Sequence, residues 1–147
     1  RAIELSRQNV SAGRGGPFGA VVVKDGVVIG EGANAVTRTN DPTAHAEVEA
    51  IRAACAHIGS FDLSGAVIYT SCEPCPMCLS AAYWARVDRI VYANDRKDAA
   101  DIDFSDDDIY REVALPLEAR SMPMQRLLVQ PITMIPTRIL RISRYVT

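Results

Sequence analysis

Two short clusters of metal-binding residue types constrain the fold of this chain more than any other feature of its sequence. The first has the pattern H-x-E at His45 and Glu47, and the second has the pattern P-C-x-x-C at Cys75 and Cys78. Each cluster opens a segment with helical character, and the second cluster closely follows an apolar, β-rich segment. Helices from successive strand–helix units can direct their N-termini at one point. We therefore expect an α/β fold in which two helix starts converge on a bound metal.

Three side chains in these clusters are candidate zinc ligands. Cys75 stands at or near a helix start, where backbone N–H groups favour the thiolate that binds metal. Cys78 lies three residues further on, along the same helical face, and His45 lies in the first turn of the other helix. One histidine and two cysteines leave the fourth position on zinc open for water. The combined pattern is the signature of zinc deaminases, which remove an exocyclic amine from a base.

Other interpretations of the cysteine cluster remain open. A lone C-x-x-C can be a redox pair, and a bacterial iron–sulfur run would need a fourth cysteine where Ala82 stands. The strongest alternative is a closed structural zinc site, which would not require Glu47. Its four ligands would be Cys72, Cys75, Cys78 and His45. We instead expect Cys72 to be a small buried residue at a strand end.

Hydrophobic periodicity and turn residues predict strands and helices in an order typical of a mixed sheet with helices packed on its faces. Residues 1–12 have an amphipathic pattern typical of a helix, and a glycine-rich loop follows. Asp41 can cap a helix whose first residue is Pro42 and which runs to about residue 56. A second helix is expected over 75–86, and the Asp-rich stretch 95–108 is expected to be a loop with a short helix after it. Strands are expected at 18–24, 27–32, 66–70 and 89–93.

Composition and charge narrow the class of function. With 147 residues, 48% of them hydrophobic, the chain is expected to form one domain over residues 1–147. Its 16 basic and 18 acidic side chains give a net charge of −2, which disfavours a nucleic-acid partner. No apolar run approaches the roughly 20 residues that span a membrane, and no signal peptide is visible. Four cysteines, three of them clustered, suit a cytoplasmic metal protein, and a start at Arg1 leads us to expect a short preceding piece.

The metal and Glu47 together suggest hydrolysis. Zinc lowers the pKa of a bound water toward neutrality, and Glu47 can take that proton and later deliver it to a ring nitrogen and the departing amine. Such chemistry needs an enclosed pocket with a few polar groups. Candidate walls are Phe18 before the first strand, Asn34 after the second and Trp84 on the second motif helix. Core packing explains Phe18 and Trp84 equally well, and a plain turn is the commoner role for Asn34.

Five stretches carry a resemblance that reaches beyond the zinc motif. They are residues 15–26, 40–48, 69–78, 83–86 and 104–110. On these stretches the chain resembles bacterial guanine deaminases of the small cytidine-deaminase-like fold, over about residues 10–124. The zinc motif is shared with the whole superfamily. The stretches that begin at Gly15 and at Phe104 are more specific to the guanine branch.

The resemblance implies a fold and a set of site residues. It implies a three-layer α/β/α cytidine-deaminase-like fold with a central mixed five-stranded sheet. It implies hydrolysis of guanine to xanthine and ammonia, with Glu47 as the main proton shuttle. Asp106 would be a second carboxylate that binds the purine edge and helps the leaving amine. Asn34 and the Ala46 backbone would bind the base.

The resemblance also implies a homodimer, and in some relatives the C-terminal segment crosses to close the partner's pocket. Here that segment would begin at about residue 127. The tail from Leu127 departs from the family pattern, because it lacks the usual aromatic-rich ending although Tyr145 stands near its end.

Other substrates and one non-enzymatic role remain alternatives. A relaxed deaminase would act on cytosine, s-triazines or related amino-heterocycles. Deaminases of tRNA and of nucleosides share the zinc motif, but the acidic balance and the Asp-rich loop argue against an RNA ligand. The non-enzymatic alternative is an inert zinc-binding structural module.

Overall fold

The structure, a computed structural model, describes residues 1–127. Contacts divide the chain into one unit over Arg1–Ala114 and a second that begins at Leu115. The expected exchange of the C-terminal segment between subunits lies outside the described residues, so it stays a prediction, as does the single domain over the whole chain. Within the described residues, no helix is long and apolar enough to cross a membrane.

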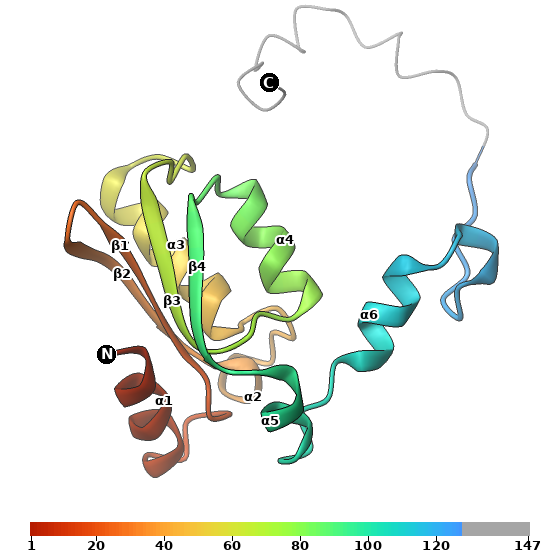
Figure 1. Ribbon diagram of the computed structural model, residues 1–147, viewed down its shortest axis with the longest axis horizontal. Coiled ribbons are helices and arrows are strands. Elements are labelled where there is room, and N and C mark those ends of the chain that lie inside the picture. The colour runs from red at the N-terminus through yellow and green to blue at the C-terminus, as the bar shows by residue number, and fades with distance from the viewer. Residues whose placement is uncertain (128–147) are drawn as a thin grey trace, which may run out of the picture. The chain divides into compact units, whose positions relative to one another are not determined.

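Four strands of the first unit form one mixed sheet in the part of the chain that the structure describes (Figure 1). They are β1 (Gly19–Lys24), β2 (Val27–Ala33), β3 (Ala66–Cys72) and β4 (Arg89–Asn94), in the order β2-β1-β3-β4. β1 is antiparallel to both of its neighbours, whereas β3 and β4 are parallel. The mixed sheet is confirmed. The expected fifth strand is not found among the described residues, because the chain continues after β4 into helices.

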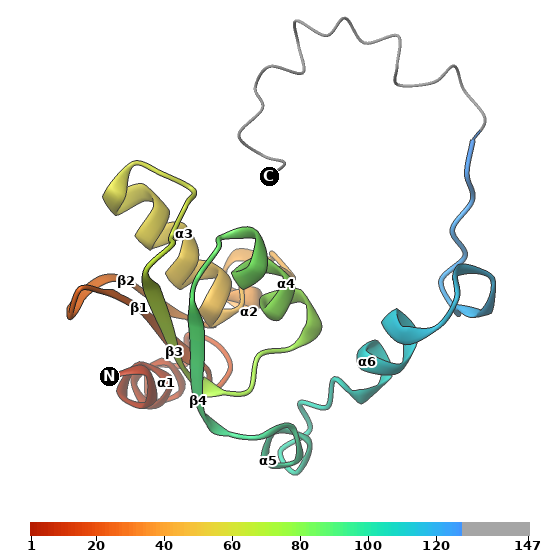
Figure 2. The ribbon, with the colours of Figure 1, turned by 45° about the horizontal axis from the view of Figure 1, so that its top comes forward.

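Helices cover both faces of the sheet (Figure 2). α1 (Ala2–Ser11) lies on one face, and α3 (Ala46–Ile58) and α4 (Pro76–Trp84) lie on the other. The remaining helices are α2 (Val36–Thr39), α5 (Arg96–Ala100) and α6 (Asp107–Ala114), with a 3₁₀ turn η1 (Leu117–Ala119) in the second unit. A Cβ on Gly19 would lie 2.4 Å from the backbone oxygen of Ala2 in α1, whereas one on Gly32 would lie 2.2 Å from that of Ala46 in α3. Gly32 pairs with Ala20, the neighbour of Gly19, so the two glycines point to opposite faces. The three-layer α/β/α arrangement is therefore confirmed.

Small residues let α3 lie close against the sheet. A Cβ on Gly30 of β2 would lie only 2.4 Å from the backbone oxygen of Ala50, so only glycine fits at this contact. The α3 side of the contact consists of fully buried alanines at four-residue spacing, Ala46, Ala50 and Ala54. This packing fixes the start of α3 beside the end of β2, where Asn34 follows.

The first motif helix begins later than the sequence suggested. α3 begins at Ala46 with His45 as its N-cap, rather than at Pro42. Asp41 does not cap the helix, because its Oδ1 accepts hydrogen bonds from the backbone N and the Oγ1 of Thr43, at 2.8 and 2.7 Å. An aspartate bonded two residues ahead stabilises a local turn instead. His45 therefore lies ahead of the first helical turn, not within it.

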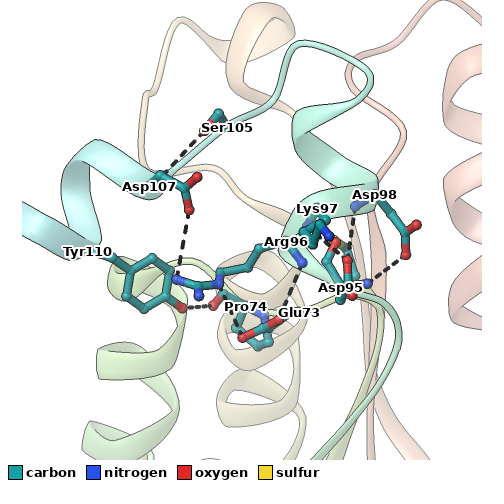
Figure 3. A network of polar contacts seen from close by, with 10 residues as sticks. Glu73, Pro74, Asp95, Arg96, Lys97, Asp98, Ser105, Asp107 and Tyr110 are labelled. Carbon is teal, nitrogen blue, oxygen red and sulfur yellow. Dashed lines mark hydrogen bonds and ion pairs between the residues drawn. The ribbon is translucent and has the colours of Figure 1, made fainter.

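The Asp-rich stretch contains a helix that the sequence pattern did not predict. Asp95 Oδ1 accepts hydrogen bonds from the backbone N–H groups of Lys97 and Asp98, at 2.8 and 3.0 Å (Figure 3). Asp98 Oδ2 accepts from the backbone N of Asp95 at 2.9 Å, which completes a reciprocal cap. These caps satisfy the N–H groups at the start of α5, which is why five residues suffice for a helix here.

Candidate active site

The starts of α3 and α4 bring three metal-binding side chains together. Cys75 is the N-cap of α4 and precedes Pro76, whose fixed φ suits the first helical position. The ligand atoms of His45, Cys75 and Cys78 all lie within 4.8 Å of one another. The Sγ of Cys75 lies 3.6 Å from Nδ1 of His45. One histidine nitrogen and two sulfurs form a donor set that suits zinc, with one position left open.

Cys72, the fourth ligand of the alternative structural site, lies outside this cluster. It is buried at the end of β3, as expected, with 6% of its surface exposed. Its thiol is directed at the backbone oxygen of Asp95, 3.6 Å away. Burial raises the pKa of Cys72 to about 11, which favours the thiol over a metal-binding thiolate. This placement favours an open site of three ligands.

The hydrogen bond between Cys75 and Cys78 shifts the pKa values of the two thiols in opposite directions. A hydrogen bond from Cys78, together with one from His45, lowers the pKa of Cys75 to about 4 despite its burial. The same contact between the sulfurs raises the pKa of Cys78. His45 has a raised pKa, chiefly because of its hydrogen bond with Cys75. The thiolate, the form that binds metal, is therefore favoured at Cys75 over Cys78.

Glu47 lies in the first turn of α3 and is buried, with 6% of its surface exposed. The Oγ1 of Thr70 on β3 donates a hydrogen bond to its Oε1 at 2.8 Å. Burial raises the pKa of Glu47, although the bond from Thr70 opposes this shift. A carboxyl group with a raised pKa gains and releases protons near neutral pH more readily than an exposed one.

A cavity of about 400 Å³ opens onto the metal cluster, within the usual range for small-molecule sites. Its walls come from the start of β1, the ends of β2 and β3, and the starts of α3 and α4. Residues of α5 and α6 and of the segment between them complete the lining. The lining includes Phe18, Asn34, His45, Glu47, Cys75, Met77, Phe104, Asp106 and Ile109. Carboxylates, an amide and aromatic rings therefore line the same small space as two of the metal-binding residues.

Asn34 is held in the cavity wall by the loop after α1. Its Oδ1 accepts from the backbone N of Gly16 at 3.3 Å, and its backbone N donates to the oxygen of Phe18 at 3.0 Å. Asn9, only 3% exposed, donates through Nδ2 to the backbone oxygens of Asn34 and Gly16, at 2.8 and 2.9 Å. A Cβ on Gly15 would lie 2.3 Å from the backbone oxygen of Asn34, so this loop requires glycine there.

Phe18, a candidate wall from the sequence, and Asp106, a substrate contact implied by the resemblance, also line the cavity, and their contact with a base stays a prediction. The ring of Phe18 meets that of Phe104 edge to face, with centroids 5.1 Å apart and an interplanar angle of 83°. Burial raises the pKa of Asp106, and the charge of Cys75 adds to the shift. Two rings and a carboxylate at one side of a cavity can bind a flat polar base.

Two other residues predicted to contact the substrate, Trp84 and Ala46, do not line this cavity. Trp84 ends α4 with 71% of its surface exposed, so the expectation that it forms a wall of this cavity is wrong. A nine-residue helix places its end about 13 Å from its start, and the cavity lies at the start of α4. Ala46 is fully buried and is not among the residues that line the cavity, so the predicted contact of its backbone with the base stays a prediction.

Sequence reasoning missed the residues that support the site. Thr70 stands in an apolar strand, and a buried hydroxyl there signals a hydrogen-bond partner elsewhere in the fold. Asn9 stands in a helix, where its buried amide carries the same signal. The identity of either partner depends on tertiary contacts that no spacing in the sequence reveals.

Comparisons with known proteins identify relatives that are zinc-binding deaminases, in agreement with the zinc-type donor set of this site. Residues 1–94 match the family model of the cytidine and deoxycytidylate deaminase zinc-binding region. The guanine deaminase of Bacillus subtilis (strain 168) is 56% identical over 123 residues, which cover 84% of this chain and 79% of that protein. An X-ray structure of guanine deaminase from Bacillus subtilis aligns with a TM-score of 0.91 and 48% identity, over 99% of this chain and 95% of that one.

A more distant relative is the tRNA-specific adenosine deaminase of Agrobacterium fabrum (strain C58 / ATCC 33970). It is 47% identical over 85 residues, which cover 57% of this chain and 56% of that protein. The family model includes His45, Cys75 and Cys78, the three residues that the fold gathers into a zinc-type donor set. The chain therefore belongs to the zinc-dependent cytidine and deoxycytidylate deaminase family.

Proposed function

We propose that the protein is a zinc-dependent aminohydrolase that converts guanine and water to xanthine and ammonia. The observation that carries this proposal is that His45, Cys75, Glu47 and Asp106 all line the same cavity. The 56% identity to a guanine deaminase, over most of the chain, supports guanine as the base.

The proposed chemistry divides between a bound metal and Glu47. Zinc held by His45, Cys75 and Cys78 supplies a Lewis acid that lowers the pKa of water toward neutrality. Glu47 takes a proton from the attacking water, and burial and Thr70 together hold its carboxyl group in place. It then delivers protons to a ring nitrogen of the base and to the departing amine, which leaves as ammonia.

The base would be held by the remaining walls of the cavity. Asn34 presents a side-chain amide, which can accept from and donate to a base edge. Asp106 accepts hydrogen bonds from purine N–H groups and assists the leaving amine. The edge-to-face pair of Phe18 and Phe104 provides an apolar surface for the flat ring.

Three alternatives predict different outcomes. A relaxed deaminase would turn over cytosine or s-triazines faster than guanine. A deaminase of tRNA would need a basic surface, whereas the net charge is −2. An inert zinc module would not require Glu47 to be buried beside the metal ligands, and Cys72 would have to join the cluster.

An ammonia-release screen tests the proposal. The zinc-loaded protein is incubated with guanine, adenine, cytosine, cytidine and guanosine in parallel. The proposal requires the highest kcat/KM on guanine, and product analysis should identify xanthine. Faster release from cytosine would support the relaxed deaminase, and no release from any base would support the inert module.

We also propose a homodimer in the cytoplasm. All four cysteines are free, which suits a reducing compartment. Tyr83 and Trp84 on α4 are 77% and 71% exposed, and Tyr92 on the neighbouring strand β4 is 49% exposed. Exposed aromatic side chains on adjoining elements are typical of protein interfaces.

Sedimentation velocity tests the dimer. The parent protein should sediment as a dimer, and the double variant Trp84→Asp, Tyr92→Asp should sediment as a monomer. Val28→Asp is the control, because Val28 is 45% exposed on β2 at the opposite edge of the four-stranded sheet. A monomeric parent protein would contradict the proposal.

A further inference from the structure

Arg96, the first residue of α5, joins two segments that border the cavity (Figure 3). Its guanidinium carbon lies 4.4 Å from the centre of the Tyr110 ring on α6. Its Nε lies 3.7 Å from Oε1 of Glu73, and its Nη1 lies 3.9 Å from Oδ1 of Asp107. Its backbone N–H also donates to Oε2 of Glu73 at 3.3 Å. One residue therefore contacts both the segment before Cys75 and the first turn of α6.

Tyr110 closes the same arrangement from the side of α6. Its hydroxyl donates to the backbone oxygen of Pro74 at 2.8 Å, one residue before Cys75 (Figure 3). A planar guanidinium stacks on an aromatic face in a way that an ammonium group does not. The stacked pair of Arg96 and Tyr110 therefore holds α6 against the chain that leads into the metal cluster.

The placement of Asp106 depends on this arrangement because Asp106 directly precedes α6. Its backbone oxygen accepts hydrogen bonds from the N–H groups of Ile109 and Tyr110, at 3.0 and 3.1 Å. Its side chain lines the cavity. A shift of the first turn of α6 would therefore move the Asp106 carboxylate relative to the metal ligands.

The contacts of Arg96 contribute more to geometry than to stability. Its ion pairs with Glu73 and Asp107 are 3.7 and 3.9 Å long, and the side chain of Arg96 is 40% exposed. Partly exposed pairs of this length contribute little to the free energy of unfolding. Their effect should instead appear in how well Asp106 is placed.

We propose that Arg96 is a positioning residue that sets the location of Asp106 in the base-binding cavity. The inference rests on the proposed function, because it takes Asp106 to contact the base. Arg96 itself is not among the residues that line the cavity. Small misplacements of a group that contacts substrate are sufficient to slow turnover strongly.

Kinetics on guanine provide the first test. Arg96→Met keeps the apolar stem and removes the guanidinium, so kcat/KM should fall about tenfold while zinc content stays unchanged. Arg96→Lys keeps the charge but loses the planar stack on Tyr110. Its kcat/KM should lie between those of the parent protein and Arg96→Met. Arg111→Met is the matched control, because Arg111 lies on α6, the helix that Arg96 contacts, and pairs with Asp108 instead. Its kcat/KM should change by less than about twofold.

A double-mutant cycle separates positioning from general destabilisation. In the Asp106→Asn background, Arg96→Met should lower kcat/KM by less than about twofold, because the group that it places is already impaired. Equal losses in both backgrounds would overturn the proposal. So would a loss in Arg111→Met as large as that in Arg96→Met.

Hydrogen exchange provides a test that does not depend on activity. The backbone amides of Ile109 and Tyr110 should exchange faster in Arg96→Met than in the parent protein or in Arg111→Met. If the parent protein releases no ammonia from guanine, the proposed function fails, and the exchange rates still decide whether Arg96 holds the start of α6. Unchanged exchange in Arg96→Met would overturn the positioning role.

Discussion

The hydroxyl of Thr70 on β3 donates a hydrogen bond to the buried carboxyl group of Glu47 on α3, with 2.8 Å between the oxygens. This bond favours the charged carboxylate and opposes the effect of burial on its pKa. It also ties the start of α3 to the central sheet, so one hydroxyl affects both the position and the protonation of Glu47.

Thr70→Val should therefore shift the pH dependence of turnover. Loss of the hydrogen bond raises the pKa of Glu47 further, and only the carboxylate can take the proton from water. The acidic limb of the kcat/KM profile for guanine should move to higher pH. Thr70→Ser retains a hydroxyl and should keep the parent profile. An acidic limb that stays in place in Thr70→Val would show that Glu47 does not set it.

Glu47→Gln should keep zinc and lose turnover, because an amide carries no proton between water and base. We expect a loss of about 10²–10⁴-fold in kcat, the usual contribution of general acid–base catalysis. The measurement is steady-state ammonia release, with zinc content determined on the same sample. Turnover near that of the parent protein would identify another group as the shuttle.

The same substitution should stabilise the metal-free protein at neutral pH. The pKa of Glu47 in the folded state lies above its usual value of 4.5 because the side chain is buried, so the folded protein binds this proton more readily than the unfolded chain does. Stability is therefore lost as pH rises from that value through the folded-state pKa. Metal-free Glu47→Gln should melt at a higher temperature than the parent at pH 7, and the difference should shrink at pH 4.

Zinc retention should distinguish the cysteines. Cys75→Ser removes a ligand of the cluster and should lose most of the metal. Cys72→Ser should retain zinc, because Cys72 lies outside the cluster and its thiol is directed at the backbone of Asp95. Metal analysis after dialysis checks both variants. An equal loss of zinc in the two variants would support the alternative interpretation, a closed structural zinc site with Cys72 as a ligand.

Asn9→Leu should weaken both stability and base binding. It leaves the backbone oxygens of Asn34 and Gly16 without this donor, at a cost of about 1–3 kcal/mol for each buried group left unpaired. Because Asn34 lines the cavity, KM for guanine should rise more than kcat falls. Gln8→Leu is the control, since Gln8 is exposed and bonds to Glu4. Equal changes in stability and in KM for Asn9→Leu and Gln8→Leu would contradict the proposed role of Asn9 in holding Asn34.

Asp106→Asn should lower turnover of guanine while zinc stays bound. A carboxylate lost from an enclosed site leaves purine N–H donors unpaired, at about 1–3 kcal/mol each, which for one donor corresponds to about 5- to 150-fold in kcat/KM. Asp108→Asn is the better control than Asp107→Asn, because Asp107 lies near Arg96. Similar losses in Asp106→Asn and Asp108→Asn would argue against guanine as the preferred base.

The sequence by itself determined the parts of this protein that depend on local spacing. Two local patterns depend only on residues that are close in sequence. They are the strand-forming residues on either side of Asp25 and Gly26, and the P-C-x-x-C pattern before an apolar helix. These patterns predicted β1, β2 and α4 to within a few residues. Spacing also identified His45, Cys75 and Cys78 as candidate ligands, since each type of ligand leaves a recognisable motif.

Only the tertiary structure decided the contacts between residues that lie far apart in the sequence. The sequence suggested that Asp41 caps a helix, but Asp41 instead accepts a hydrogen bond from Thr43 within a local turn. The close packing of α3 on β2 positions the start of this helix. Trp84 resembled a pocket wall, but the length of α4 carries it away from the cavity. Burial and hydrogen-bond pairing depend on which elements the fold brings together, so neither leaves a local pattern.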